Sequence, residues 1–261
     1  MRRSIAAIVG KEMRLYFSSP IVYVLAAVFL IITDFLAYLQ IVNYSNMATQ
    51  MMRFQQDLSQ LNMHRFIFQP SFGNMGFILL LMTPLLTMRL ISEEKKGRTL
   101  ELLLTSPLTI SEIVLGKFLA AFSIYLILLA LTLHLPLILA TFTTIPIAPL
   151  ISAYLGLAMM GGIFVSFGLF ASALSENQIV SAVTSFGILI GLWVMGAGGA
   201  ESGGGVETPM QAVLDFLSLG RHLDNMLKGL IDTRDISYFL SLTALGLFLS
   251  HRVIESTRWR G

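Results

Sequence analysis

Residues 89–117 read RLISEEKKGRTLELLLTSPLTISEIVLGK and carry nine charged side chains. The flanking segments 71–88 and 118–175 contain no Asp, Glu, Lys or Arg. An apolar stretch of about 20 residues is long enough to cross the hydrocarbon core of a bilayer as a helix. The pattern therefore predicts a charged loop on one side of a membrane, between membrane spans that precede and follow it.

The composition of the whole chain also favours a membrane protein. Hydrophobic residues make up 55% of its 261 residues, charged residues make up 12%, and the mean hydropathy is +0.77. A soluble domain carries about 25% charged residues. Six spans of about 20 residues each fit into this length with loops between them, and they leave no room for a separate soluble domain. We therefore expect a single-domain, all-α integral membrane protein with six transmembrane helices.

The spans are assigned from the uncharged stretches and the turn residues between them. Before the first span, apolar residues recur at helical spacing with basic residues off that stripe, which predicts an amphipathic helix over 3–18 on the inner membrane surface. An ordinary basic flank before a first span is the alternative reading of that segment. The expected spans are 21–42, 71–91, 112–141, 150–174, 177–196 and 236–253.

Several polar residues are expected to start these helices. Thr109 with Glu112, and Ser175 with Gln178, have the spacing of a capping box, in which two side chains satisfy free N–H groups at a helix start. Asp235 is expected to cap the last span.

A polar segment precedes the last span and is expected to form extracytoplasmic helices over 208–232. Thr208-Pro209 reads as an N-cap followed by the first helical position, and Gly220 is expected to interrupt the helix. Four apolar residues at helical spacing form its predicted buried stripe: Leu223, Met226, Leu227 and Leu230.

The distribution of positive charge predicts the orientation. With the expected spans, 12 of the 17 Lys and Arg residues fall in the N-terminal segment, the loop 89–117 and the C-terminal segment. Lys and Arg are enriched in loops on the cytoplasmic side of membranes. We therefore expect both termini and the charged loop to be cytoplasmic.

The loop contains a short amphipathic helix. Gly97 ends the preceding helix and Pro107 ends this one. Leu100, Leu103 and Leu104 fall on one face, while Arg98, Glu101 and Thr105 fall on the other. A helix of two turns is not stable alone, so the leucine face is expected to dock on a protein surface.

These residues carry a resemblance to a known family. The sequence E-E-x-x-G-R-T-L-E-L-L-L-T-S-P-L-T-x-x-E-I-V-L-G-K resembles the cytosolic coupling segment of ABC-2-type transporter permeases, and the gliding-motility-type and copper-processing-type permeases are the most similar branches. The similarity extends over nearly the whole chain, through its basic N-terminus, its expected spans and its helical segment before the last span.

The resemblance implies a permease subunit of an ATP-driven transporter, an exporter in the bacterial cytoplasmic (inner) membrane. It implies two copies of a separate ATPase subunit that hold ATP and Mg, and a second permease subunit, either identical or different. The coupling segment 93–107 would contact the ATPase. The residues expected to carry this contact are Glu93, Glu94, Arg98, Thr99, Leu100, Glu101, Leu103 and Leu104.

The chain itself lacks the motifs of an enzyme. No G-x-x-x-x-G-K-[ST] phosphate-binding loop, H-E-x-x-H or G-x-S-x-G sequence occurs, and the chain has no Cys. We therefore expect no catalytic site, no cofactor of its own, no metal site and no nucleic-acid partner, with membrane lipids around the spans. Two alternatives remain: a membrane scaffold that transports nothing, and an ion-coupled secondary carrier driven through Asp34.

Two ionisable residues fall inside expected spans. Asp34 lies in the first span and His134 lies in the third, two residues before Pro136. Ionisable side chains are costly in the membrane and often line transport paths, so both are candidates for the transport path. The competing reading is structural: the Asp34 carboxyl group is satisfied by Thr or Asn neighbours or is protonated, and Pro136 frees a backbone carbonyl one turn earlier that a neighbouring group could bond.

Gly187 and Gly191 are spaced four residues apart in the fifth span. Such a pair of small residues allows a second helix to approach closely. The partner helix is either another permease subunit or a helix of this chain.

Methionines surround the first outer loop. Thioethers are soft ligands that suit Cu(I), but methionine also fills gaps in apolar cores, and no M-x-M cluster occurs. The residues concerned are Met47, Met51, Met52, Met63 and Met75.

Overall fold

The computed structural model of the protein describes residues 2–55, 57, 61–105, 108–142, 146–195 and 217–258. Within these residues every regular element is a helix, and none is a strand. The predicted all-α class is confirmed.

Five helical segments are long and apolar enough to cross a membrane: Pro20–Arg53, His64–Lys96, Ile110–Ala140, Ile147–Leu174 and Thr233–Thr257. A further apolar helix, α9 (Gln178–Val194), has 17 residues and is shorter than these five. It occupies the position of the predicted fifth span. The count of six spans therefore stays a prediction, because a helix of 17 residues lies at the lower end of the length that spans a bilayer.

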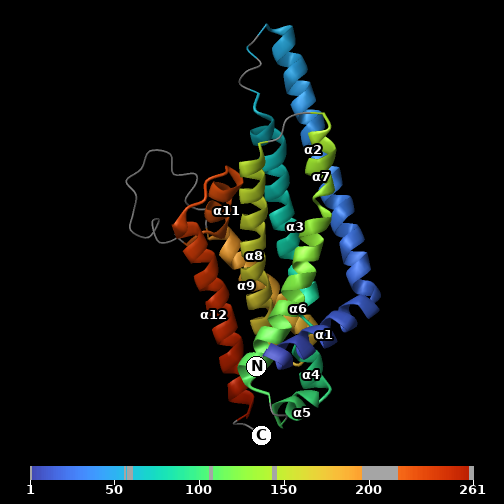
Figure 1. Cartoon of the computed structure of the whole chain (residues 1–261), viewed down its shortest axis with the longest axis vertical. Coiled ribbons are helices and arrows are strands. Elements are labelled where there is room, and N and C mark those ends of the chain that lie inside the picture. The colour runs from blue at the N-terminus through green and yellow to red at the C-terminus, as the bar shows by residue number, and fades with distance from the viewer. Residues whose placement is uncertain are drawn as a thin grey trace.

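The helices form an elongated bundle (Figure 1). The segments around the bundle are α1 (Arg2–Ser18), α2 (Pro20–Arg53), η2 (His64–Phe68), α3 (Gln69–Thr87), α6 (Ile110–Leu131), α7 (His134–Ala140) and α12 (Thr233–Arg258). The central helix is α8 (Ile147–Leu174), which contacts α3, α6, α9 and α12 as well as α11 (Leu219–Leu227). Because α8 is surrounded by other helices, most of its side chains are buried.

Small residues on α8 allow its neighbours to approach. A Cβ atom on Gly168 would lie 2.2 Å from the Thr87 Oγ1 atom of α3, and one on Gly161 would lie 2.1 Å from the Tyr125 ring of α6. The Tyr125 hydroxyl donates to the Leu157 carbonyl at 2.9 Å, which satisfies the buried phenol. These contacts fix α3 and α6 against the central helix.

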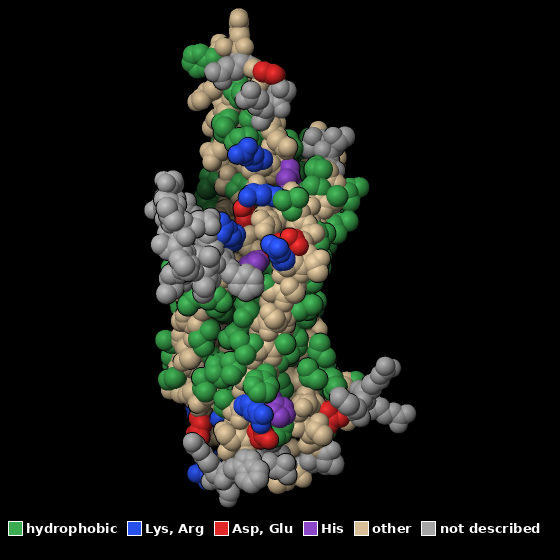
Figure 2. Space-filling view, turned by 90° about the vertical axis from the view of Figure 1, so that its left-hand side faces the viewer, with side chains coloured by type: hydrophobic (Ala, Val, Ile, Leu, Met, Phe, Trp, Pro, Cys, Tyr) green, Lys and Arg blue, Asp and Glu red, His purple; other side chains and the backbone are tan. Residues whose placement is uncertain are grey.

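Both termini lie at one end of the bundle, together with α4 (Ser92–Lys96) and α5 (Thr99–Thr105) (Figure 1). We call this the α4–α5 end. Hydrophobic side chains cover the middle of the molecule, and charged side chains gather above and below them (Figure 2). This surface suits a bilayer around the middle of the bundle.

The third predicted span, 112–141, is broken into α6 and α7 at Thr132–Leu133. Pro136 has no N–H group, so the carbonyl one turn earlier lacks its helical partner. The Thr132 hydroxyl bonds the Leu129 carbonyl at 2.7 Å and the Tyr154 hydroxyl at 3.1 Å, and it joins the break to α8.

The structure confirms one predicted cap and corrects another. Thr109 and Glu112 form the expected capping box at the start of α6. At α9 the cap is Asn177, whose side chain accepts from the Ile179 N–H at 2.9 Å, while Ser175 accepts from the Asn177 N–H at 3.0 Å. Ser175 lies two residues too early, because α9 begins at Gln178.

Asp235 does not cap the last span as predicted. It lies in the first turn of α12, 2% exposed, and its Oδ1 atom is 2.5 Å from Nδ1 of His222 on α11. This contact joins α11 to α12.

The predicted outer helices are described in part, since residues 196–216, with Thr208-Pro209, lie outside the described residues. Gly220 does not interrupt a helix, because it lies inside α11. Leu223, Met226 and Leu227 are buried as expected, whereas Leu230 follows the helix and is 62% exposed.

Candidate functional site

A buried ion cluster joins three helices at the α4–α5 end. The Lys117 Nζ atom of α6 lies 2.8 Å from Glu12 Oε1 of α1, 2.9 Å from Glu94 Oε1 of α4 and 2.6 Å from the Leu90 carbonyl. The Lys117 side chain is 2% exposed. An ammonium group has three N–H donors, and here each faces an acceptor. We call Lys117, Glu12 and Glu94 the Lys117 cluster.

The cluster makes α1, α4 and α6 depend on one another. A buried ion pair is not by itself a strong net source of stability, because both charges lose their hydration. Removing one partner, however, leaves an uncompensated buried charge and destabilises by roughly 3–5 kcal/mol. Movement of α4 away from α1 and α6 therefore meets a large energetic penalty.

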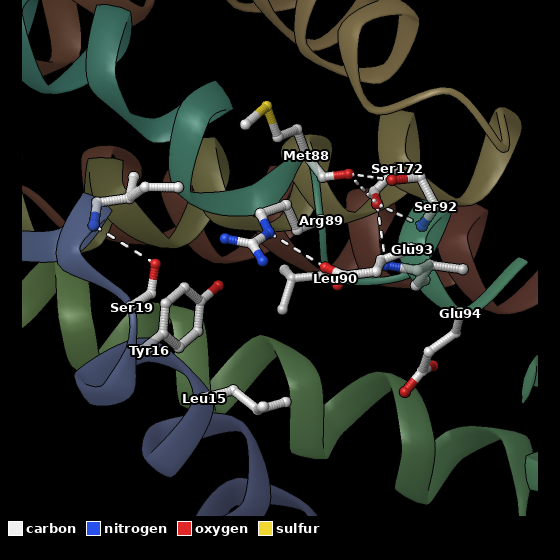
Figure 3. A network of polar contacts seen from close by, with 12 residues as sticks. Leu15, Tyr16, Ser19, Met88, Arg89, Leu90, Ser92, Glu93, Glu94 and Ser172 are labelled. Carbon is white, nitrogen blue, oxygen red and sulfur yellow. Dashed lines mark hydrogen bonds and ion pairs between the residues drawn. The ribbon is translucent and has the colours of Figure 1, made fainter. Parts of the chain in front are cut away.

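A serine of the central helix holds the reversal between α3 and α4 (Figure 3). The Ser172 hydroxyl donates to the Met88 carbonyl at 3.0 Å and accepts from the N–H groups of Ile91 at 3.0 Å and Ser92 at 3.1 Å. These backbone groups lie where one helix ends and the next begins, so they lack helical partners. Ser172 is fully buried and satisfies all three.

Tyr16 ties α1 to the end of α3. Its hydroxyl donates to the Leu86 carbonyl at 2.8 Å. Burial raises the pKa of the Tyr16 phenol above its ordinary value, so the hydroxyl stays neutral and remains a donor. A second contact to α1 is the pair between Lys11 and Glu94, whose Nζ and Oε1 atoms are 3.1 Å apart.

The reversal between α4 and α5 occurs at Gly97 and Arg98. Gly97 follows the last residue of α4, as predicted, and Arg98 adopts a φ of 54°. This left-handed backbone conformation is uncommon for a residue with a side chain. It turns the chain so that α5 starts at Thr99 in a new direction.

Leu100, one of the three leucines on the predicted docking face of α5, faces the core of this chain and not a partner. Leu100 is 3% exposed and packs in the hydrophobic core of this chain. The short helix therefore docks on its own membrane domain, and Leu100 offers no surface to a partner. Leu103 is half-buried, and the side chain of Leu104 and residues 106–107 lie outside the described residues.

The outward surface of the segment is polar. Glu94 is half-buried and belongs to the Lys117 cluster. Glu93 also forms a pair with Arg89, whose Nε atom is 3.1 Å from Glu93 Oε2. The exposed residues are Glu93, Lys96, Gly97, Arg98, Thr99, Glu101 and Thr105.

The two ionisable residues expected inside spans are brought together. His134 Nε2 lies 3.0 Å from Asp34 Oδ1, and His134 Nδ1 lies 2.7 Å from the Leu131 carbonyl. The side chains are 39% and 42% exposed, respectively. The histidine bonds the Leu131 carbonyl near the helix break, rather than the Thr132 carbonyl that Pro136 leaves free, and it also contacts the carboxyl group of α2. A role of either residue in the transport path stays a prediction.

Gly187 and Gly191 do not pack against another helix of this chain. A Cβ atom on either glycine would meet nothing within 4 Å. Among the described residues, the alternative that this pair packs against another helix of the same subunit is therefore wrong. A contact with another subunit stays a prediction.

The methionines do not share one environment. Met75 is 1% exposed and lies in the core, whereas Met47 and Met52 are 39% and 62% exposed on α2. Met75 thus fills apolar space in the core of the bundle. The described residues contain no group of three or more His, Asp or Glu side chains that could hold a metal ion.

Sequence reasoning missed Glu12, Lys117 as a cluster member, and Ser172. Glu12 is an acidic residue in an amphipathic helix whose other charged residues are basic. Lys117 lies inside α6, seven residues after its first residue, Ile110. Each of these two charged residues indicated a buried partner of opposite charge. Ser172 gave no signal, because serine is common in helices that pack closely.

One protein-family model matches both the α4–α5 end and the central bundle. This family model, described as ABC-2 family transporter protein, matches residues 6–252. No curated protein matches the chain. The match includes the Lys117 cluster, α4, α5 and all five candidate spans except the last residues of α12. The chain belongs to the ABC-2 transporter family, and it is a multi-pass membrane subunit of an ABC transporter.

Proposed function

We propose that this chain is a permease subunit of an ABC exporter in the bacterial cytoplasmic membrane, and that its α4–α5 end receives the motion of the ATPase. The family implies association with an ABC ATPase subunit. In the proposed assembly two ATPase subunits hold ATP and Mg, a second permease subunit completes the membrane domain, and this chain carries no catalytic site. The gliding-motility and copper-processing permeases are the proposed branch.

The polar outer surface of α4 and α5 supports the ATPase contact. Glu93, Arg98 and Glu101 are exposed there, while Leu100 anchors the segment in the core. When a partner binds exposed charged residues, complementary charges on its surface fix its orientation. The proposed contact therefore comprises the exposed polar residues and not Leu100, while the predicted contacts of Leu103 and Leu104 stay part of the proposal.

The Lys117 cluster and Ser172 support transmission. A displacement of α4 is transmitted to α1 and α6 through Lys117, and to α8 through Ser172. Packed helices respond by shifting between discrete arrangements, because cores are not continuously deformable. Moving a two-state membrane domain from mostly inward to mostly outward requires a differential binding free energy of about 5.5 kcal/mol. Closure of an ATP-bound ATPase dimer is the proposed source.

Charge reversal on the outer surface tests this contact. Arg98→Glu combined with Glu101→Lys is expected to abolish co-purification of the ATPase, detected in the purified complex by photolabelling with an azido-ATP analogue. The matched control swaps the charges of a half-exposed pair, Asp224 on α11 and Lys228 directly after α11, with Asp224→Lys and Lys228→Glu. Retained ATPase in the first variant would remove the coupling role from this segment. ATPase turnover that responds to no substrate would favour the scaffold reading.

The Asp34–His134 pair favours ion-coupled transport as a second candidate. A neutral imidazole has one N–H donor and one acceptor, yet both ring nitrogens here face oxygen atoms. The contact to Asp34 therefore requires a further proton, either on the imidazole or on the carboxyl group. In this candidate, a proton held between α2 and α7 is the coupling ion. Transport by vesicles with a proton gradient and no ATPase would support this candidate, and its absence would exclude it.

A further inference from the structure

A cleft of about 490 Å³ lies beside the Lys117 cluster, between α1, the start of α2 and the turn from α3 to α4. Figure 3 shows Leu15 and Tyr16 of α1 facing Arg89 and Glu94 across this space. The volume falls within the range of ligand sites, about 300–1,000 Å³. The apolar part of its lining comprises Leu15, Ile21, Val22, Leu85, Leu86 and Leu90.

The charged lining carries both signs in equal number. Lys11, Arg89 and Lys117 face the cleft with Glu12, Glu93 and Glu94, so three positive and three negative groups balance. An anionic ligand gains no net attraction from such a site. A ligand that carries one positive and one negative group is attracted by both sets of charges.

Two of these groups keep unused hydrogen-bonding capacity. Arg89 directs its Nε–H to Glu93, and a guanidinium group has five N–H donors. Glu94 Oε2 is buried and receives no hydrogen bond from any described residue, although Glu94 Oε1 faces two lysines. The cleft thus offers donors for a phosphate, and Glu94 of its lining holds a buried carboxylate oxygen that accepts from an N–H donor once the side chain turns toward the cleft.

The position of the cleft matches the headgroup level of a bilayer. Its rim includes the apolar side chains of Leu15, Ile21 and Leu85, which are 53%, 41% and 42% exposed. Above them α2 exposes further apolar residues, and on the other side lie the charged residues of α4. Amphipathic interfacial helices such as α1 lie at this boundary.

We propose that the cleft binds an inner-leaflet phospholipid with a phosphate and a primary ammonium group, of the phosphatidylethanolamine type. Arg89 binds the phosphate, Glu94 accepts from the ammonium, and the acyl chains run along α2 and the end of α3. Phosphatidylglycerol brings no cation for Glu94. Phosphatidylcholine brings a cation without N–H groups. The site rests on the membrane location of the chain and not on the ATPase contact.

Native mass spectrometry of the transporter, purified from membranes and supplied with each lipid in turn, tests the site. Phosphatidylethanolamine is expected to be retained about ten-fold more strongly than phosphatidylglycerol or phosphatidylcholine, because only it satisfies both groups. Equal retention of the three lipids would overturn the proposal.

Matched variants locate the bound lipid. Arg89→Gln is expected to lower retention of phosphatidylethanolamine about ten-fold. The control is Arg14→Gln, because Arg14 is exposed on α1 and does not line the cleft. Equal retention by both variants would contradict the assignment of Arg89.

Leu15→Trp fills the cleft and is expected to remove the lipid preference while the ATPase still co-purifies. If Leu15→Trp released the ATPase and left lipid retention unchanged, the cleft would belong to the ATPase contact and the lipid proposal would be wrong. Because lipid retention and ATPase co-purification are read separately, failure here is distinct from failure of the proposed coupling surface.

Discussion

Lys117 of α6 and Glu12 of α1 lie 2.8 Å apart in a site where the lysine side chain is 2% exposed. They are 105 residues apart in the sequence. Together with Glu94, they connect the N-terminal helix to the segment proposed to contact the ATPase.

Lys117→Met leaves Glu12 and Glu94 buried without their shared cation. We expect a loss of roughly 3–5 kcal/mol in the free energy of unfolding, measured by denaturation of the purified subunit in detergent. Adding Glu12→Gln is expected to recover part of that loss. The control is Lys96→Met, at an exposed position of α4. Equal stability of the two lysine variants would show that the cluster contributes little.

Ser172→Ala removes the acceptor of the Ile91 and Ser92 N–H groups at the turn from α3 to α4, while the Met88 carbonyl still accepts from the Ser92 hydroxyl. Unsatisfied buried groups cost about 1–3 kcal/mol, so the variant is expected to lose stability and to weaken stimulation of the ATPase by the membrane subunit. Ser166→Ala is the control, since Ser166 is equally buried on α8 and donates only to Ile163 of its own helix. Identical ATPase stimulation in both variants would argue against transmission through Ser172.

Gly168→Ala places a Cβ atom 2.2 Å from Thr87 Oγ1 and 2.7 Å from Thr87 Cβ. Overpacking of this kind destabilises by about 1–3 kcal/mol. Thr87→Ala in the same chain is expected to relieve only part of the clash, because alanine removes the Thr87 Oγ1 atom but keeps the Cβ atom. Gly187→Ala, which meets nothing within 4 Å, is expected to be neutral or stabilising by up to about 1 kcal/mol. Thermal unfolding of the four proteins checks the order.

Asp34 and His134 are expected to be energetically coupled. A double-mutant cycle with Asp34→Val and His134→Val should give a coupling free energy of about 1 kcal/mol, because each side chain is the partner of the other at 3.0 Å. Asp34→Asn is expected to retain the contact, since an amide N–H can donate to Nε2 without the additional proton. A coupling free energy near zero would mean that the two groups act independently.

Local signals predicted local structure. The capping box at Thr109 and the helix end before Gly97 depend on residues within one turn, and both are present. The same kind of signal erred at α9, where Ser175 and Asn177 both have capping side chains and the chain selects the later one. Spacing alone does not decide between two nearby caps.

Contacts between residues far apart in the chain could not be predicted from the sequence alone. The period of Leu100 and Leu103 correctly indicates an amphipathic helix, but it does not say which surface buries the leucines, and Leu100 packs on its own chain. Asp34 and His134 were each recognised as unusual inside a span, yet nothing in one sequence pairs residues that are 100 positions apart. The break after α6 follows from Pro136, whose effect on the backbone is local.

The most direct test of the central claim is site-specific crosslinking to the ATPase subunit. The chain has no Cys, so Glu101→Cys introduces a single reactive position on the exposed surface of α5. Lys228→Cys does the same beside α11, outside the α4–α5 end. A short thiol-to-amine crosslinker in the assembled transporter is expected to join position 101 to the ATPase and to leave position 228 unlinked. A crosslink from position 228, with none from position 101, would contradict the account.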